Sequence, residues 1–266
     1  FIYFSSGLPD YKKLADYQPP ISSRVYSKDG KLLAEYAIEK RIFVPIDAVP
    51  KTVINSFLSA EDKNFFEHPG VDAKGILRAI IKNIQNILGD KRLEGASTIT
   101  QQVAKNFLLT NEVSIKRKIK EAILAFRIEK AYSKKRILEL YLNQIYLGQG
   151  TYGVAAASLE YFDKSIKDLD YSEAALLAAL PKAPSRYNPV KDPAEAKFRR
   201  NLVLKNLKNN GFINEKEFIE FKNKKIKLKQ RKIEIVNEAN SYTEEVRRII
   251  KDKYGFEKLY TQGLNI

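Results

Sequence analysis

An acidic pair, Glu61-Asp62, ends a predicted helix in this 266-residue chain. Val53, Phe57 and Glu61 are spaced i, i+4, i+8, so the Glu61 carboxylate falls on the apolar face of that helix. Burial on such a face raises the pKa of a carboxyl group towards the range in which it can transfer protons as a general base. The alternative is a structural carboxylate that makes an ion pair or a cap.

A second candidate site is the segment Gly95-Ala96-Ser97-Thr98, which leads into a predicted helix. Glycine and hydroxyl residues before a helix can present free N–H groups and the positive end of the helix dipole to an anion. Lys105 lies one turn after Gln101 and could reach the same ligand. The alternative is an ordinary Ser or Thr N-cap.

The third candidate is the cationic run Lys116-Arg117-Lys118-Ile119-Lys120-Glu121. Glu121 stands four residues after Arg117, which is the spacing of a helical ion pair. A diphosphate site has the same appearance, because such a ligand needs several cations and groups that orient them. The sequence leaves both readings open.

Two apparent metal motifs are better explained as structure. Asp168 and Asp170 form a D-x-D pattern, but they precede a predicted helix over 171–180, where Asp is a common N-cap. His68 is the single histidine, so a zinc site is not expected. We expect His68 to fix the turn at Pro69-Gly70 by hydrogen bonding.

The elements that position these residues are mostly helical. A hairpin that turns at Asp29-Gly30 is expected within residues 23–44, followed by a further strand at 41–44. Pro50 is placed at the first position of the helix that carries Glu61. Helices are predicted over 50–62, 72–88, 97–108, 113–131, 133–147, 151–160, 171–180, 193–210, 214–224 and 242–254.

Composition restricts the partners more than the fold. Lys and Arg number 47 against 32 Asp and Glu, a net charge of +15, which favours anionic partners. No recognised nucleic-acid motif accompanies that charge, so no specific nucleic acid is expected. The chain has no cysteine, which excludes disulfides and thiolate metal sites. It also has no methionine, which indicates a piece of a longer protein.

Two segments bear on a membrane. The predicted helix at 74–88 sets a row of isoleucines and leucines against Lys74, Arg78 and Lys82. This pattern fits either a helix that lies at a membrane interface or a buried core helix with snorkelling lysines. Residues 1–4 are apolar but too few to span a bilayer, and they fit either the end of a removed transmembrane helix or a hydrophobic start.

Five segments in this order resemble the peptidoglycan glycosyltransferase family, the glycosyltransferase domain of class A penicillin-binding proteins and the monofunctional transglycosylases. They are Glu61-Asp62…Phe65…His68-Pro69-Gly70, the segment from Gly95 to Gln102, Arg117-Lys118-Ile119-Lys120-Glu121, the segment from Ile137 to Gly148, and the segment from Ala174 to Ser185. The resemblance covers about residues 23–220. One departure is Asp163, which stands where the family usually has glycine.

The resemblance implies a role for each matching residue. Glu61 would be the general base and Glu121 a second catalytic carboxylate at the donor diphosphate, acting either alone or through a divalent cation (Mg or Mn); no cofactor is strictly required. Positive charge there would come from Lys105, Arg117 and Lys118. The implied substrate-binding residues also include Asp62, Ser97, Gln101 and Gln102. Asn143 would have a structural role.

The resemblance also implies a reaction and a fold. Lipid II would be added to a lipid-linked glycan strand through an inverted β-1,4 linkage, with release of the polyprenyl diphosphate. The fold would be mainly α, two-lobed and lysozyme-like, with a small N-terminal β-hairpin. Its divisions would be a lead-in at 1–22, the glycosyltransferase domain at 23–222 with a membrane-dipping jaw at 69–93, and a linker at 223–266 towards a missing transpeptidase domain.

A place in the cell and an inhibitor follow from the same resemblance. The expected location is the outer, periplasmic face of the bacterial cytoplasmic membrane, against an anionic surface, with anchoring by an N-terminal helix absent from this chain. The phosphoglycolipid moenomycin is expected to compete for the donor site. The alternative function is a lysozyme-like glycoside hydrolase that acts on peptidoglycan, in which two carboxylates cleave the glycosidic bond.

Overall fold

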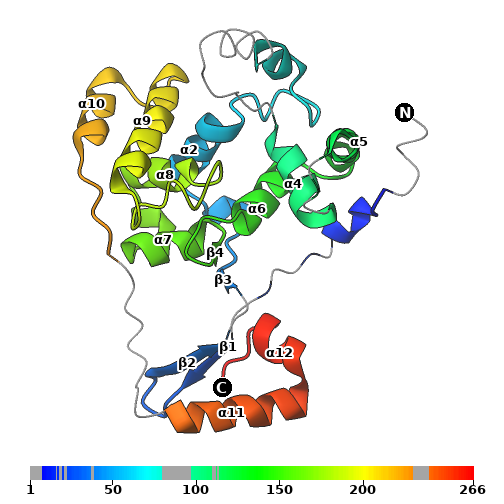
Figure 1. Ribbon diagram of the computed structural model, residues 1–266, viewed down its shortest axis with the longest axis vertical. Helices are drawn as coiled ribbons and strands as arrows, with labels where there is room; N and C mark the ends of the chain where they lie inside the picture. Colours follow the sequence, from blue (N-terminus) through cyan, green and yellow to red (C-terminus); the bar gives the residue numbers. More distant parts are fainter. Residues whose placement is uncertain are drawn as a thin grey trace.

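A computed structural model of the chain describes residues 8–15, 17, 20, 23–36, 39–79, 97–109, 112, 114–229 and 240–266. The architecture is mainly α with a small antiparallel hairpin, as the sequence predicts (Figure 1). The described strands are β1 (Ser23–Tyr26), β2 (Leu32–Tyr36), β3 (Lys40–Arg41) and β4 (Thr151–Tyr152). Short 3-10 turns are η1 (Tyr11–Leu14), η2 (Ile46–Ala48) and η3 (Ile166–Asp168).

Each of the described α-helices except α12 corresponds to a predicted helix, and they follow one another in the predicted order. They are α2 (Lys51–Glu61), α4 (Ile99–Leu108), α5 (Ile115–Ala131), α6 (Lys134–Gln144), α7 (Val154–Phe162), α8 (Tyr171–Ala179), α9 (Pro193–Asn209), α10 (Glu215–Asn223), α11 (Asn240–Tyr254) and α12 (Phe256–Thr261). A further helical stretch occupies residues 73–79, the start of the helix predicted at 72–88. The rest of that prediction, and residues 80–93 of the predicted jaw, lie outside the described residues.

The apolar core is centred on α8, where every residue from Ala174 to Leu180 is buried. Small alanine side chains let neighbouring helices approach closely, and α8 packs against both α2 and α9. A second packing centre is α4, which lies against α5 and α6. Packing between these buried helix faces therefore fixes the helices that carry the candidate site residues.

The hairpin forms a small unit with the end of the chain. β1 and β2 are antiparallel, and Gly30 takes φ +80° in the predicted turn. The Arg24 amide donates to the Leu264 carbonyl at 2.8 Å, and the Ile266 amide donates to the Arg24 carbonyl at 2.9 Å. Figure 1 shows β1, β2, α11 and α12 together at the lower end of the molecule. The predicted division of the chain into a lead-in, a domain and a linker stays a prediction.

Four details differ from the sequence-based expectations. Pro50 is the N-cap of α2 with an extended ψ of 148°, one residue before the first helical position. The strand expected at 41–44 is β3, which ends at Arg41. The helix expected from residue 151 begins at Val154, because residues 151 and 152 pair with β3 in parallel as β4. α12 was not predicted at all.

The turn after α7 keeps its left-handed geometry despite the departure from the family pattern. Asp163 has φ +51° and ψ +42°, the conformation that glycine adopts most easily. A short polar side chain tolerates that conformation better than most residues do. The Asp163 carboxylate also accepts an ion pair from Lys229 at 2.7 Å. The substitution therefore leaves the turn intact.

Candidate active site

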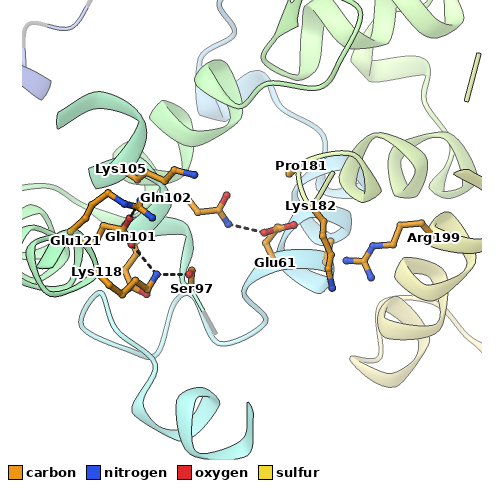
Figure 2. Close-up of a pocket in the computed structure, with 12 residues that line it drawn as sticks. Glu61, Ser97, Gln101, Gln102, Lys105, Lys118, Glu121, Pro181, Lys182 and Arg199 are labelled. Carbon is orange, nitrogen blue, oxygen red and sulfur yellow. Dashed lines mark hydrogen bonds and ion pairs between the residues drawn. The ribbon is translucent and has the colours of Figure 1, made fainter. Parts of the chain in front are cut away.

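Glu61 is the last residue of α2, and the helix itself explains its position. Val53 and Phe57, which precede it on the same face, are fully buried. Glu61 continues that face but is only partly buried, because its carboxylate opens into a pocket of about 310 Å³. Figure 2 shows it pointing into the pocket from α2, opposite the side chains of α4 and α5.

The surroundings of Glu61 fit a proton-accepting carboxylate. Burial is the largest influence and raises the pKa of Glu61 above its usual value, as the sequence predicted. A 2.7 Å hydrogen bond from Gln102 Nε2 to Glu61 Oε2 lowers it, as do the charges of Arg199 and Lys182. The charge of Asp62 adds to the increase. Burial outweighs the opposing contacts.

Asp62 connects the end of α2 to the start of α4. Its carboxylate contacts His68 Nε2 at 2.9 and 3.0 Å and accepts from the Ile99 amide at 2.9 Å. The Asp62 side chain is 3% exposed. His68 also accepts from the Gly70 amide at 3.2 Å, which confirms its predicted role in the turn. Asp62 lines a neighbouring pocket, but its oxygens are engaged by the protein.

The N-terminus of α4 is satisfied by protein groups. Thr98 is the N-cap, and its hydroxyl accepts from the Gln101 amide, while Gln101 Oε1 accepts from the Thr98 amide at 3.0 Å. Asp62 takes the Ile99 amide, so an anionic side chain already lies at the positive end of the helix dipole. The N-cap reading of this segment is therefore confirmed for Thr98, and the backbone anion site stays a prediction.

A cluster of charge lies across the pocket from Glu61. Glu121 on α5 is 2% exposed, and its Oε1 accepts from Arg117 and its Oε2 from Lys118 at 2.8 Å. Lys118 Nζ also contacts Ser97 Oγ at 2.6 Å. The predicted ion pair between Arg117 and Glu121 is present, and it holds both cations at the pocket wall.

The pocket brings together eight of the nine predicted site residues. Glu61, Ser97, Gln101, Gln102, Lys105, Arg117, Lys118 and Glu121 all line it. Asp62, the ninth, lines the neighbouring pocket. Figure 2 shows Glu61 and Glu121 on opposite sides with Gln102 between them. Residues remote in the sequence therefore meet at one cavity.

Sequence reasoning missed two cations in the same pocket. Lys182 follows α8, and Arg199 lies on α9; both line the pocket beside Glu61 (Figure 2). Lys182 stands in the fifth resembling segment, so a signal for it was available. Arg199 had no such signal, because it is one of several cations on a helix with little apolar periodicity. Its Nε is buried and has no hydrogen-bond partner among the described residues.

A second pocket adjoins the first on the other side of Glu61. The two share Ala60, Glu61, Ser97, Lys182 and Arg199 among their lining residues. The second pocket is also lined by Asp72, Gly75, Arg78 and Ala79, from the segment that leads into the predicted jaw. The cavity is therefore a continuous groove with Glu61 near its middle.

The described residues do not suit a divalent cation near Glu121. Mg²⁺ and Mn²⁺ prefer several oxygen ligands. Both oxygens of Glu121 are already paired with cations, and Arg117 and Lys118 would repel a metal ion. Within the described ranges, no group of three or more His, Cys, Asp or Glu side chains could hold a metal.

Asn143 and the D-x-D pattern both have structural roles. Asn143 Oδ1 accepts from the Val44 amide at 2.8 Å, and its Nδ2 donates to the Val44 and Glu139 carbonyls. Asn143 thus fixes the strand-like segment before α2 to α6, as the resemblance implies. Asp170 is the N-cap of α8 in a capping box with Glu173, which confirms the structural reading of that pattern.

Comparison with known proteins identifies the family of this chain. A family model described as transglycosylase matches residues 29–208. The chain belongs to the transglycosylase family. This transglycosylase is 51% identical over 265 residues to a penicillin-binding protein 1A of Rickettsia felis and 47% identical over 249 residues to one of Aquifex aeolicus. The alignments cover 99% and 94% of this chain and 34% of each relative, so the chain spans about a third of their length.

A solved structure supports the fold. The crystal structure of penicillin-binding protein 1A from Haemophilus influenzae matches with a TM-score of 0.55 and 28% sequence identity. The match covers 94% of this chain and 27% of that one. Together with the family match, it supports a peptidoglycan glycosyltransferase function for this transglycosylase domain.

Proposed function

We propose that this chain polymerises lipid II into β-1,4-linked glycan strands by inverting transfer, with Glu61 as the general base. The observation that carries the proposal is the shared pocket: a partly buried carboxylate with a raised pKa faces a wall of cations across one cavity. A glycosyl diphosphate donor requires both features, a base for the attacking hydroxyl and positive charge for the departing diphosphate.

The cationic end of the pocket suits the donor. Arg117 and Lys118 are held in place by Glu121, and Lys105 on α4 lines the same wall. Among the described residues the Lys105 ammonium has no hydrogen-bond or ion-pair partner. Charged N–H donors form short, strong hydrogen bonds with phosphate oxygens. Glu121 therefore acts by orienting the cations that bind the diphosphate.

Glu61 suits the transfer step. The acceptor sugar's 4-hydroxyl gives its proton to the Glu61 carboxylate as its oxygen attacks the donor anomeric carbon. A new C–O bond forms there, and the bond from that carbon to the diphosphate oxygen breaks. The electron pair leaves with the polyprenyl diphosphate, which the cations stabilise. Attack from the face opposite the leaving group inverts the anomeric centre.

Hydrolysis of the lysozyme type fits the geometry less well. That reaction needs a second carboxyl group that can donate or accept a proton or attack the sugar. Both oxygens of Glu121 are paired with cations, which leaves it poorly suited to that work. A neutral glycosidic bond also gives no reason to gather positive charge around the pocket.

The groove provides a path from a membrane surface to Glu61. The second pocket is lined by part of the 72–79 segment, and on that segment Leu77 is 61% exposed beside the exposed cations Lys74 and Arg78. Phe66, just before it, is 57% exposed. Apolar and cationic side chains together suit an anionic bilayer surface. This supports action at the outer face of the bacterial cytoplasmic membrane.

No helix in the described part of the chain combines the length and the apolar character that a membrane span requires. We propose that an N-terminal helix outside this chain anchors the protein. Moenomycin, which carries a phosphate and a lipid, would occupy the donor end of the pocket.

The decisive experiment is incubation of the purified chain with fluorescent lipid II. A ladder of glycan polymers that moenomycin suppresses is the expected result. Glycan release from purified sacculi without any ladder would instead favour the hydrolase. Absence of both products, in a protein whose circular dichroism shows the folded helical content, would overturn the proposal.

A further inference from the structure

Tyr141 packs against a residue of α2, the helix that ends in Glu61. It belongs to α6 and is 1% exposed. Its ring meets the ring of Phe57 edge-on, with centroids 6.2 Å apart and an interplanar angle of 75°. Phe57 precedes Glu61 by about one turn of the same helix. The Tyr141 side chain is therefore packed directly against the face that ends in Glu61.

The hydroxyl of Tyr141 is an exception among the buried tyrosines. It is buried and has no hydrogen-bond partner among the described residues. Tyr161 is also 1% exposed, but its hydroxyl donates to the Leu147 carbonyl at 2.9 Å. Buried polar groups are nearly always paired, so an unpaired one calls for a functional explanation.

Acidic neighbours supply that explanation. Burial, and then the charges of Glu61 and Asp62, raise the pKa of the Tyr141 hydroxyl well above its usual value. The hydroxyl therefore keeps its proton at neutral pH and can act as a hydrogen-bond donor. The Asp62 carboxylate is already engaged by His68 and the Ile99 amide. Gln102 engages only Oε2 of Glu61, so Oε1 keeps acceptor capacity.

We propose that Tyr141 is a positioning residue for Glu61: its O–H dipole turns towards the Glu61–Asp62 pair and stabilises the charged carboxylate of Glu61. This inference rests on the proposed role of Glu61 as the base. It explains how a carboxylate in a buried setting stays available to accept a proton. A buried phenylalanine would fill the same space without the dipole.

Several other groups act on Glu61, and the test must separate them. Gln102 on α4 donates a hydrogen bond, Lys182 after α8 and Arg199 on α9 bring positive charge, and Asp62 brings negative charge. His68 contacts Asp62. None of these contacts involves the Tyr141 ring, so a change confined to the hydroxyl isolates its effect.

The test is the variant Tyr141→Phe. Its Glu61 pKa is measured by NMR titration of the Glu61 carboxyl carbon in protein labelled at the glutamate carboxyls. The Glu61 signal is assigned by its loss in Glu61→Gln. The expected result is a Glu61 pKa higher by about one unit. The acid limb of the kcat/KM profile should move to higher pH by the same amount. Incorporation of 3,5-difluorotyrosine at position 141, which makes the hydroxyl a stronger donor, should lower the Glu61 pKa.

Tyr161→Phe is the matched control, since it removes a buried hydroxyl remote from Glu61. It should lower the melting temperature because the Leu147 carbonyl loses its donor, and it should leave the Glu61 pKa unchanged. An unchanged or lowered Glu61 pKa in Tyr141→Phe, or an unmoved one in the fluorinated protein, would overturn the inference. The titration needs no turnover, so it decides the role of Tyr141 even if Glu61 proves not to be the base.

Discussion

Gln102 and Glu61 are joined by a 2.7 Å hydrogen bond although 41 positions separate them in the sequence. Both partners of this hydrogen bond are fixed by the fold. Glu61 ends α2, and α4, which carries Gln102, begins at a capping box and at the carboxylate of Asp62. The amide donor is thus positioned before any substrate arrives, which is the arrangement expected of a preorganised site.

Gln102→Met should move the pH dependence of the reaction. Glu61 must be deprotonated to act as a base, so kcat/KM falls as the pH drops through its pKa. The Gln102 hydrogen bond lowers that pKa, and its removal should shift the acid limb to higher pH by about one unit. The measurement is kcat/KM for lipid II polymerisation across the acidic range. A limb that stays in place or moves to lower pH would show that the contact does not tune the base.

Gln101→Met provides the comparison for that experiment. Gln101 is adjacent in the sequence, but its side-chain oxygen serves the cap of α4. Its loss should lower the free energy of unfolding by about 1 kcal/mol without moving the acid limb. The two neighbouring glutamines are therefore expected to separate an effect on the base from an effect on the helix.

Glu61→Gln should remove polymerisation while the fold is kept. An amide has nearly the shape of the carboxyl group but cannot accept the proton, so the rate should fall by about 10²–10⁴-fold. The raised pKa of Glu61 means that folding disfavours its charged form at neutral pH. The melting temperature of Glu61→Gln at pH 7 should therefore equal or exceed that of the parent. Glu67→Gln, a change at an exposed carboxylate outside the pocket, should retain activity.

Arg117→Ala with Lys118→Ala should weaken donor binding. These two side chains supply charged donors at the pocket wall, and the loss of each should raise KM for the donor about tenfold. Inhibition by inorganic diphosphate should weaken in parallel. Because Glu121 would be left buried without its partners, the changes are best made together with Glu121→Gln. Lys116→Ala removes an exposed cation from the same helix and should leave KM unchanged.

If the combined variant binds diphosphate and donor as the parent does, the cations are structural and the donor lies elsewhere in the groove. The salt dependence offers an independent check. Electrostatic contacts with phosphate weaken as salt rises. The parent should therefore lose donor affinity with added salt more steeply than the variant does.

Helical periodicity was sufficient to predict much of this molecule. The apolar spacing that ends in Glu61 predicted both its place on α2 and the upward shift of its pKa, because burial on a helix face follows from the sequence alone. The i, i+4 spacing of Arg117 and Glu121 likewise predicted their ion pair. Local rules of this kind succeed where the partners lie on one helix.

The features that were missed depend on tertiary contact. Arg199 reaches Glu61 only because α9 packs on α8 and α2. β4 forms through a parallel pairing with a strand more than a hundred residues earlier, which no local pattern records. The backbone of α4 resembled an anion site, yet Asp62 fills that position from another helix. The resemblance to a family pointed to two carboxylates, Glu61 and Glu121, that line one pocket, but it could not show how Asp62 is used.

Asp62→Asn should destabilise the protein, and it should also lower the Glu61 pKa somewhat, because the charge of Asp62 raises that pKa. The Asp62 carboxylate accepts from the Ile99 amide and contacts His68 while 3% exposed, so its contacts tie α2, the turn and α4 together. An amide nitrogen facing these donors loses at least one bond and leaves a buried donor unpaired, at a cost of about 2–4 kcal/mol. Urea unfolding measures this loss. Asp47→Asn breaks an ion pair in which Asp47 is 82% exposed, and should change stability by less than about 0.5 kcal/mol. A fully stable Asp62→Asn variant with impaired polymerisation would instead place Asp62 among the groups that bind substrate.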